Sequence, residues 1–307
     1  MAALLASPAT AARAVDARAA ASPSQLDALR ASLATRARPR DGVAAGPTVL
    51  VVAGGRGGSG TSLASALLAL AAAGDGHRTL LIDTDELVGP QALLLGAAPA
   101  LRWPMLRGGA VDARRLPVAI TPTLSLVAGG RGDAWQLAAS VDDTPLTAAE
   151  RRACFLRLHA LADGHTLVVI DAGSRLDSVL AAIDGARANV RLVVVTGGQD
   201  PIALAAAYAL LKAVHARHPT LALDLLTNRL DDATAVRVAD TIAHGAEQFL
   251  GRAIAFAGAL PMDSALDAAL RAGMPFLDAV TGSPVAVAAH DTVLRMVPAA
   301  SPSRFGA

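Results

Sequence analysis

The most constraining feature of the sequence is a glycine-rich segment that directly follows a short apolar run. Residues 48–52 read TVLVV, and residues 54–74 read GGRGGSGTSLASALLALAAAG. A β-branched strand, a glycine-rich turn and an alanine- and leucine-rich helix, in that order, are the layout of a phosphate-binding loop. Glycines let backbone N–H groups turn toward phosphate oxygens, and the positive end of the helix adds to the attraction. We therefore predict a strand–loop–helix unit that binds phosphate, against the alternative of a simple flexible turn.

One position of this loop departs from the usual pattern. Residues 55–62, GRGGSGTS, fit the spacing G-x-x-x-x-G-K-[ST] except that Thr61 stands at the lysine position. Ser62 stands where a hydroxyl would ligate Mg²⁺. The sequence thus predicts a phosphate cradle without its usual ammonium group.

Composition narrows the class of protein. The formal net charge is +1 and aromatic residues make up 3%, so the core must be aliphatic and bulk charge gives no support for nucleic-acid binding. Cys154 is the single cysteine, which excludes a disulfide framework and fits a reducing cytoplasm. No apolar run approaches the roughly 20 residues that span a bilayer, and the N-terminus has no basic region of a secretory signal. We expect a cytoplasmic protein, with peripheral association at the cell pole or inner membrane left open.

From residue 48 onward, short apolar runs alternate with helix-forming segments. The runs predicted as strands are 48–52, 79–82, 124–127, 165–170, 191–195, 221–226 and 254–258. The clearest predicted helices are 201–217, 232–250 and 264–272. Such alternation indicates an α/β fold with three layers, in which a mostly parallel, twisted sheet has helices on both faces. Polar residues follow several strand ends, where ligands of open parallel sheets bind.

The chain divides into three parts by composition. Residues 1–46 are rich in small residues, Pro and Arg, and are predicted to be a flexible extension with a helical patch in which Leu26, Leu29 and Leu33 share one face. A nascent helix in a disordered tail is the alternative for this patch. Residues 47–285 are expected to form the P-loop domain, and residues 286–307 a C-terminal helix and tail.

Motifs along the chain resemble those of the MinD/ParA family of deviant P-loop ATPases. They are the glycine loop, DTD at 83–85, VVIDAG at 168–173, NR at 228–229 and PMD at 261–263. The family loop reads K-G-G-x-G-K-[ST], and Arg56 stands at the position of its first, signature lysine. The resemblance covers about residues 47–285. It implies the MinD (SIMIBI-type) P-loop NTPase fold, with ATP or ADP and Mg²⁺ as cofactors whose binding is weakened by the loss of the lysine.

The resemblance also implies which residues would contact the nucleotide. Asn228 would read the edge of adenine, and Arg229 could stack on the base, whereas a simple turn is the alternative for Asn228. The implied nucleotide-binding positions are Gly57, Gly58, Ser59, Gly60, Thr61, Ser62, Asn228, Arg229, Pro261 and Asp263.

Metal-binding and catalytic positions follow from the same resemblance. Mg²⁺ would lie near Ser62, Asp83 and Asp171, with Asp171 acting through water. Asp85 would orient the attacking water if the protein is active, and Arg56 would supply charge at the signature-lysine position. Strand-end turns and helix capping are the alternative roles of the aspartates.

Within the family, the chain looks most like the FlhG (FleN) branch of flagellar-number regulators. The similar stretches are 80–96, 177–214 and 249–277. That branch carries an N-terminal D-Q-A-x-x-L-R motif that stimulates the GTPase FlhF. Residues 24–30, SQLDALR, keep Gln25, Leu29 and Arg30 at that spacing as candidate partner-binding residues.

The implied partners are therefore proteins. They are an FlhF-like GTPase, and flagellar switch (C-ring) proteins or a flagellar transcription regulator, with a homodimer left open. Membrane association is expected to be weak or absent, because the helix predicted at 284–296 has Arg295 as its one basic residue. Nucleic-acid binding is not expected.

Two interpretations of the function stay open. The first is a FlhG-like regulator of flagellar number or placement that acts through nucleotide-linked protein contacts. Losing one preorganised donor to developing charge typically costs about 10²–10³ in rate, so ATP hydrolysis would be weak or absent. The second is a pseudo-ATPase scaffold of another MinD/ParA system that partitions protein clusters or DNA, or accompanies cellulose synthesis. Whether the chain is an enzyme is undecided at this point, because the family hydrolyses ATP but Thr61 replaces its lysine.

Overall fold

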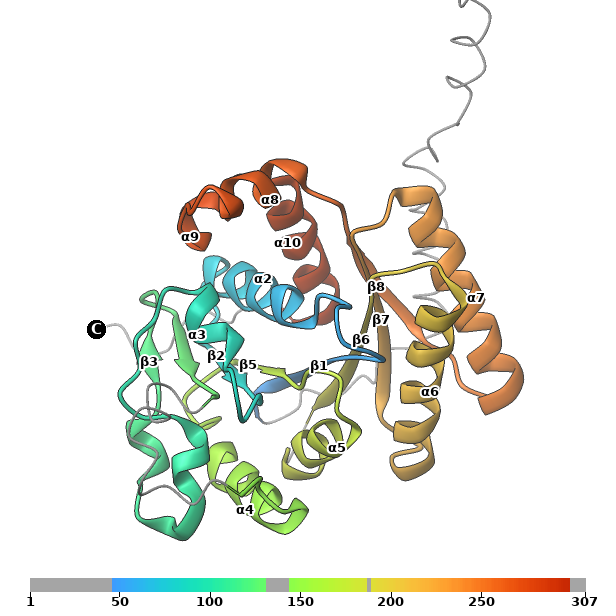
Figure 1. Ribbon diagram of the computed structural model, residues 1–307. Helices are drawn as coiled ribbons and strands as arrows, with labels where there is room; N and C mark the ends of the chain where they lie inside the picture. The colour runs from blue at the N-terminus through green and yellow to red at the C-terminus, as the bar shows by residue number, and fades with distance from the viewer. Residues whose placement is uncertain (1–45, 131–143, 187–188, 299–307) are drawn as a thin grey trace, which may run out of the picture.

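A single eight-stranded sheet runs through the centre of the computed structural model, which describes residues 46–130, 144–186 and 189–298 (Figure 1). The strand order is β3-β4-β2-β5-β1-β6-β7-β8, and only the β3–β4 pair is antiparallel. The strands are β1 (Thr48–Gly54), β2 (Thr79–Asp83), β3 (Val118–Ala119), β4 (Leu124–Val127), β5 (Leu167–Asp171), β6 (Val190–Thr196), β7 (Ala222–Asn228) and β8 (Ala255–Leu260). This architecture confirms the predicted fold class.

Helices cover both faces of the sheet (Figure 1). They are α2 (Thr61–Gly74), α3 (Pro90–Leu94), α4 (Ala148–His159), α5 (Leu176–Gly185), α6 (Pro201–Arg217), α7 (Asp232–Leu250), α8 (Ser264–Arg271), α9 (Phe276–Val280) and α10 (Pro284–Met296), with the 3₁₀ segments η2 (Trp103–Gly109) and η3 (Ala113–Arg115). None of the helices in the described ranges is both long enough and apolar enough to cross a bilayer.

Two hydrophobic cores lie on opposite faces of the sheet, because side chains alternate along each strand. In β1, Val49 and Val51 join the core under α4–α7, whereas Leu50 and Val52 join the core under α2, α3 and α8–α10. Every residue of β1 is buried, as expected for a central strand covered on both faces. The aliphatic strands therefore fix β1, and the loop that follows it, at the middle of the sheet.

The parallel arrangement brings the carboxyl ends of the strands to one edge. Val52 of β1 pairs in register with Asp171 of β5, and Asp171 in turn pairs with Asp83 of β2. Gly54, at the end of β1, pairs with Val195 of β6. The glycine loop and the two aspartates predicted from the sequence are thus neighbours at this edge.

The last helix is part of the packed domain. Val285, Ala289 and Val293 of α10 are buried in the same core as α2, and His290 Nε2 is within hydrogen-bond distance, 2.8 Å, of Asp75 Oδ1 at the end of α2. The division expected between residues 285 and 286 falls inside this helix. One side of α10 thus packs into the core, whereas Val287 and Leu294 are exposed.

Candidate functional site

The glycine loop connects β1 to α2 at the centre of the sheet edge. Gly58 and Gly60 have φ angles of 79° and 84°, which glycine adopts without strain. A Cβ atom at Gly57 or Gly58 would meet nothing within 4 Å, so the outer side of the loop is open. Gly60 caps α2 without a side-chain hydrogen bond, which leaves the first N–H groups of the helix for another acceptor. The loop therefore has the backbone of an anion cradle.

Thr61 turns away from the cradle. Its side chain is 8% exposed, and its Oγ1 lies 2.7 Å from the position that a Cβ on Gly54 would take. The hydroxyl thus packs against the end of β1 instead of reaching over the loop. Ser59 is also buried and donates from Oγ to the carbonyl oxygen of Arg56 at 2.9 Å, which fixes the shape of the loop. Neither Thr61 nor Ser59 therefore places a positive charge where the lysine of the usual loop would lie.

Arg56 is the cation that the loop itself carries. Its Nη2 lies 3.1 Å from Asp200 Oδ2, and the two side chains are 42% and 46% exposed. Asp200 also accepts the N–H of Ala203 as the cap of α6, and this hydrogen bond is the main cause of the lowered pKa of its carboxyl. In this conformation Arg56 pairs within its own chain, at the solvent-exposed side of the loop.

Asp171 lies deep behind the loop at the end of β5. Its side chain accepts hydrogen bonds from Gln91 Nε2 at 2.8 Å, from the Gly173 N–H at 3.3 Å and from the hydroxyl of Ser62. It is 2% exposed, and burial raises the pKa of its carboxyl. The predicted proximity of Ser62 and Asp171 is therefore present, with Gln91 as a third member.

Asp83 is buried beside Asp171, whereas Asp85 is exposed to solvent. Asp83 is fully buried and accepts the N–H groups of Asp85 at 3.0 Å and Gln91 at 2.9 Å. Burial first, and the neighbouring Asp171 second, raise the pKa of Asp83 to about 8. Asp85 is exposed, and its Oδ1 accepts the N–H groups of Leu87 and Val88 at 2.7 and 2.9 Å. Asp85 shapes its own loop in this conformation, which is the turn role that the sequence left open.

The predicted base-binding residues gather at the ends of β7 and β8. Asn228 is 1% exposed and donates from Nδ2 to the Ser59 carbonyl oxygen at 3.1 Å, while its Oδ1 has no hydrogen-bond partner among the described residues. Arg229 forms a bidentate ion pair with Asp267 at 2.9 and 2.5 Å. Asn228 thus braces the phosphate loop through its amide nitrogen, and its side-chain oxygen is an unused acceptor among the described residues.

The segment after β8 completes this side of the site. Pro261 is partly buried, and Asp263 caps α8 by accepting the Leu266 N–H at 2.9 Å. Asp263 Oδ2 is buried and lacks a partner in the part of the chain that is described. Gln25, Leu29 and Arg30, the candidate partner-binding residues, lie outside the described residues.

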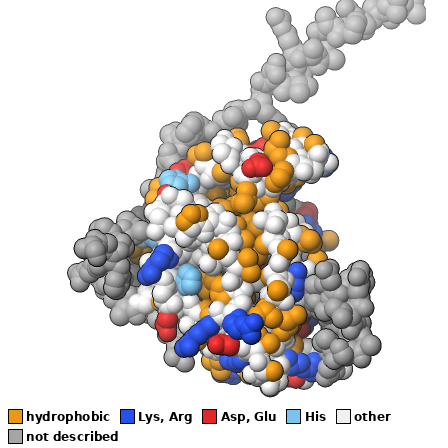
Figure 2. Space-filling model, turned by 90° about the vertical axis from the view of Figure 1, so that its left-hand side faces the viewer, with side chains coloured by type: hydrophobic (Ala, Val, Ile, Leu, Met, Phe, Trp, Pro, Cys, Tyr) orange, Lys and Arg blue, Asp and Glu red, His pale blue; other side chains and the backbone are white. Residues whose placement is uncertain are grey.

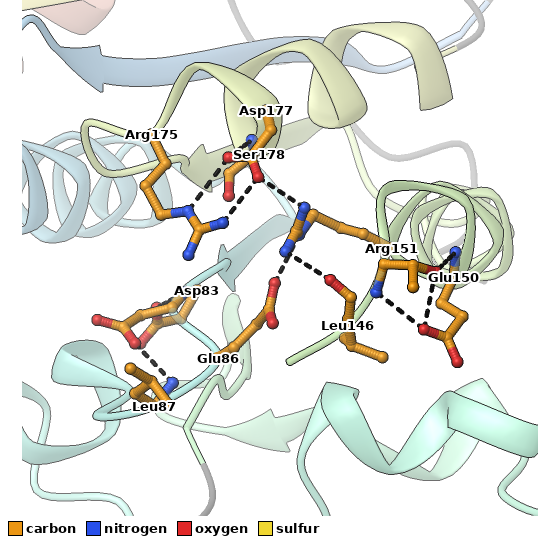
Figure 3. A network of polar contacts seen from close by, with 11 residues as sticks. Asp83, Glu86, Leu87, Leu146, Glu150, Arg151, Arg175, Asp177 and Ser178 are labelled. Atoms are coloured by element: carbon orange, nitrogen blue, oxygen red, sulfur yellow. Dashed lines mark hydrogen bonds and ion pairs between the residues drawn. The ribbon is translucent and has the colours of Figure 1, made fainter. Parts of the chain in front are cut away.

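Sequence reasoning missed two residues that organise the site. Gln91, at the start of α3, is fully buried and contacts both Ser62 and Asp171. Arg151 of α4 is 2% exposed and bonds to Glu86, in the loop after β2, and to Asp177 at the start of α5 (Figure 3). A glutamine just ahead of the apolar run 92–95 was the one local signal for Gln91; Arg151 has none, because a charged residue on a helix normally faces solvent.

Mg²⁺ does not fit the site in this arrangement. The ion prefers six oxygen ligands, which at phosphate sites are waters, one or two carboxylates and the phosphates themselves. Around Asp171 the neighbouring groups are instead N–H and O–H donors, from Gln91, Gly173 and Ser62. These three neutral donors already engage the carboxylate that would hold the hydrated ion.

Hydrophobic side chains are exposed near the site. Leu87 and Val88, in the loop after Asp85, are 63% and 61% exposed, and Leu93 of α3 is 76% exposed. The face toward which α3 and α9 lie carries an interrupted band of hydrophobic side chains (Figure 2). Such surfaces are typical of protein-binding regions.

Comparison with known proteins gives sequence relatives of two kinds, whereas no family model matches the chain. Two uncharacterised proteins of Mycobacterium tuberculosis strains are 35% identical over 181 residues, which is 57% of this chain and 46% of each relative. The matched region thus spans about half the length of these relatives. The antiactivator FleN of Pseudomonas aeruginosa is 25% identical over 225 residues, covering 73% of this chain and 76% of FleN.

Solved structures share the fold at low sequence identity. The cell division ATPase MinD of Pyrococcus furiosus matches with a TM-score of 0.62 at 16% identity, over 81% of this chain and 98% of MinD. A ParA-family ATPase of Chlorobium tepidum matches with a TM-score of 0.62 at 19% identity, over 80% and 98%. The septum site-determining protein MinD of Pyrococcus horikoshii, complexed with Mg-ADP, matches with a TM-score of 0.59 at 16% identity, over 80% and 94%. The chain therefore has the fold of the MinD/ParA-type P-loop ATPases.

Proposed function

We propose that this chain is a nucleotide-linked regulator of the MinD/ParA type, which acts through protein contacts and hydrolyses ATP weakly or not at all. One observation carries the proposal: the glycine cradle keeps its backbone shape, while Thr61 at the lysine position packs against Gly54. Phosphate binding depends on backbone N–H groups and the helix terminus, which are retained. Hydrolysis depends on a cation at the transferred phosphoryl group, which the loop lacks at this position.

The nucleotide would be ATP or ADP, with its phosphates on residues 57–62. Support comes from the fold it shares with a MinD complexed with Mg-ADP. The unpartnered oxygens of Asn228 and Asp263 are acceptors for the exocyclic amine and the hydroxyl groups of a nucleoside, with Arg229 and Pro261 beside them. Two buried acceptors without partners are costly in an empty site, and a bound ligand would satisfy them.

Weak or absent hydrolysis follows from three residues together. Thr61 supplies no charge, Arg56 is paired with Asp200, and the Asp85 carboxylate is engaged by the turn that follows it. Removing one such transition-state donor typically costs about 10²–10³ in rate. Arg56 could regain the role of the signature lysine only after leaving Asp200, for example in a homodimer.

The flagellar role is the first candidate for the biological function. FleN is 25% identical over most of both chains, and residues 24–30 keep part of the motif through which that branch stimulates an FlhF-like GTPase. Exposed Leu87, Val88 and Leu93, beside the site, supply an apolar surface for such partners or for flagellar switch proteins or a transcription regulator. A purified FlhF-like GTPase tests this candidate: stimulation by the full chain, lost in the Gln25→Ala variant, supports it.

A scaffold in another MinD/ParA system is the second candidate. The observation that favours it is the missing lysine, since Thr61 packs against Gly54 and leaves the loop without its usual cation. Such a scaffold would use the fold for protein contacts alone. A salt-dependent affinity for DNA would instead point to a partitioning role.

A titration with a fluorescent ATP analogue separates a nucleotide switch from a scaffold. Saturable binding, in either excess Mg²⁺ or EDTA, and displacement by unlabelled ADP are expected for the switch. The absence of saturable binding under both conditions would eliminate the switch and leave the scaffold. The Gly60→Ala variant is the negative control, because its Cβ would lie 1.9 Å from Asn228 Nδ2 and displace the loop.

A further inference from the structure

A carboxamide joins the phosphate loop to the end of β5. Gln91 Nε2 donates to the Ser62 carbonyl oxygen at 2.8 Å and to Asp171 Oδ2 at 2.8 Å. Both N–H bonds of the amide are thus used, one toward the first turn of α2 and the other toward the strand-end carboxylate. In P-loop proteins that use Mg²⁺, the hydrated ion lies between the hydroxyl of the P-loop Ser or Thr and the strand-end carboxylate. Here the Ser62 hydroxyl bonds to Asp171 directly, and the Gln91 amide donates to the same carboxylate.

The Gln91 side chain is held in this place by its own backbone. Its N–H donates to Asp83 Oδ2 at 2.9 Å, and α3 begins one residue earlier, at Pro90. Gln91 is fully buried and the next residue, Ala92, is 1% exposed. Because the side chain is buried, moving the amide away would leave Asp171 without one of its hydrogen-bond donors.

The chemistry of the amide excludes it as a metal ligand through nitrogen. An amide nitrogen has no free lone pair and offers only donors, whereas Mg²⁺ needs oxygen acceptors. Gln91 Oε1 is buried without a partner among the described residues, but one neutral oxygen cannot replace a hydration shell. The carboxamide instead supplies, without net charge, the hydrogen bonds that metal-bound water would donate to Asp171.

We propose that this phosphate loop takes its nucleotide as the metal-free anion, with the Gln91 carboxamide in the place of hydrated Mg²⁺. The inference rests on the proposed nucleotide binding and states the form in which the ligand binds. The proposal also agrees with two other features of the site. Thr61 at the lysine position adds no charge, and the Asp83 carboxyl is buried away from water.

The first test compares affinities for a fluorescent ADP analogue in EDTA and in excess Mg²⁺, using the full chain. Equal dissociation constants, within about twofold, are the expected result, because neither condition changes the site. Binding that is about tenfold or more tighter with Mg²⁺ would overturn the inference while leaving the proposed nucleotide switch intact. No binding in either condition would overturn both, so the two failures are distinguishable.

The second test gives the site an acceptor in place of the donor. Gln91→Glu keeps the shape but sets a carboxylate 2.8 Å from Asp171 Oδ2, where a divalent cation would relieve the repulsion. Electron paramagnetic resonance of Mn²⁺ in the presence of ADP should show a bound ion in Gln91→Glu and none in the wild type. Gln248→Glu, the same change on the exposed side of α7, is the matched control and should bind none.

A neutral variant keeps the inference testable if Gln91→Glu fails to fold. Gln91→Met retains the length of the side chain but neither donates a hydrogen bond nor adds charge. It should weaken ADP binding equally in EDTA and in Mg²⁺, and bind no Mn²⁺. Stoichiometric Mn²⁺ binding by the wild-type protein with ADP would contradict the inference whatever the variants do.

Discussion

Arg151 Nη1 lies 2.9 Å from Asp177 Oδ2, and this contact joins α4 to the start of α5. The same guanidinium donates through Nε to Glu86 Oε1 at 2.5 Å and through Nη2 to the Leu146 carbonyl oxygen at 3.2 Å (Figure 3). Glu86 follows the strand end at Asp83, and Asp177 follows the strand end at Asp171. One buried cation therefore fixes the relative position of the two loops that flank the phosphate cradle.

Arg151→Ala is expected to destabilise the protein strongly. Removing one partner of a buried, hydrogen-bonded ion pair typically costs about 3–5 kcal/mol, because the remaining charges are left buried without a partner. We expect the lower end of this range, because Asp177 is partly exposed. Denaturant-induced unfolding measures the change. The control is Arg175→Ala, which removes a 64% exposed cation from the same Asp177 and should cost less than about 1 kcal/mol. Equal losses in the two variants would contradict the assignment.

Gly60→Ala should disrupt the loop, whereas Gly57→Ala should leave the stability of the fold nearly unchanged. A Cβ at Gly60 would lie 1.9 Å from Asn228 Nδ2, and its φ of 84° is unfavourable for alanine by roughly 1–2 kcal/mol before the clash is counted. A Cβ at Gly57 would meet nothing within 4 Å. Thermal unfolding checks both variants, and an ADP titration checks Gly60→Ala; normal ADP binding by Gly60→Ala would show that Asn228 does not brace the loop.

Thr61→Lys should tighten the binding of ATP more than that of ADP. The substitution restores a cation to the loop, and a third phosphate group offers it more negative charge. We expect ATP to bind about tenfold more tightly, which corresponds to roughly 1.4 kcal/mol of binding free energy. Thr61→Ser, which keeps a hydroxyl and adds no charge, is the control. A lysine that leaves ATP affinity unchanged would mean that the loop cannot direct it to the phosphates.

Asp83 makes stability depend on pH with a definite sign. Its pKa is raised from 3.8 to about 8 by burial first, so the folded chain holds this proton more tightly than the unfolded chain. The resulting stabilisation is fully present below pH 4 and is lost as the pH rises through about 8. The slope from one such proton is at most about 1.4 kcal/mol per pH unit.

Asp83→Asn removes this titration. The free energy of unfolding of the variant should fall less steeply between pH 5 and pH 8 than that of the wild type, whatever its absolute stability. Asp224, whose pKa is also raised by burial and which lies on another strand, titrates in both proteins and cancels in the comparison. Parallel curves would show that Asp83 is ionised in the folded protein at neutral pH.

Local patterns predict most of the fold. The helices at 201–217 and 232–250 have the predicted bounds because Asp200 and Asp231 cap them, and alternating aliphatic strands place β1 between covered faces. The two-residue β3 is too short to show a pattern, and α4 was missed because its buried face includes the charged Arg151.

The candidate site is only partly predictable from the sequence. Glycine spacing and strand ends locate Asp83, Asp171 and Ser62, since parallel strands bring their ends together. The role of Gln91 depends on a contact between residues 80 positions apart, which no local pattern encodes. The Arg151 bridge likewise joins Glu86 across 65 positions. Long-range polar contacts of this kind follow from packing, not from periodicity.

The most direct test of the account is a single-turnover experiment with ATP labelled on its γ-phosphate and the full chain in excess. Weak or absent hydrolysis predicts that most of the label is retained with the protein as intact ATP, and that Thr61→Lys releases phosphate faster than the wild type. Release of labelled phosphate by the wild type that is as fast as in Thr61→Lys and is abolished by Gly60→Ala would contradict the account, because the loop would then hydrolyse ATP without need of a lysine.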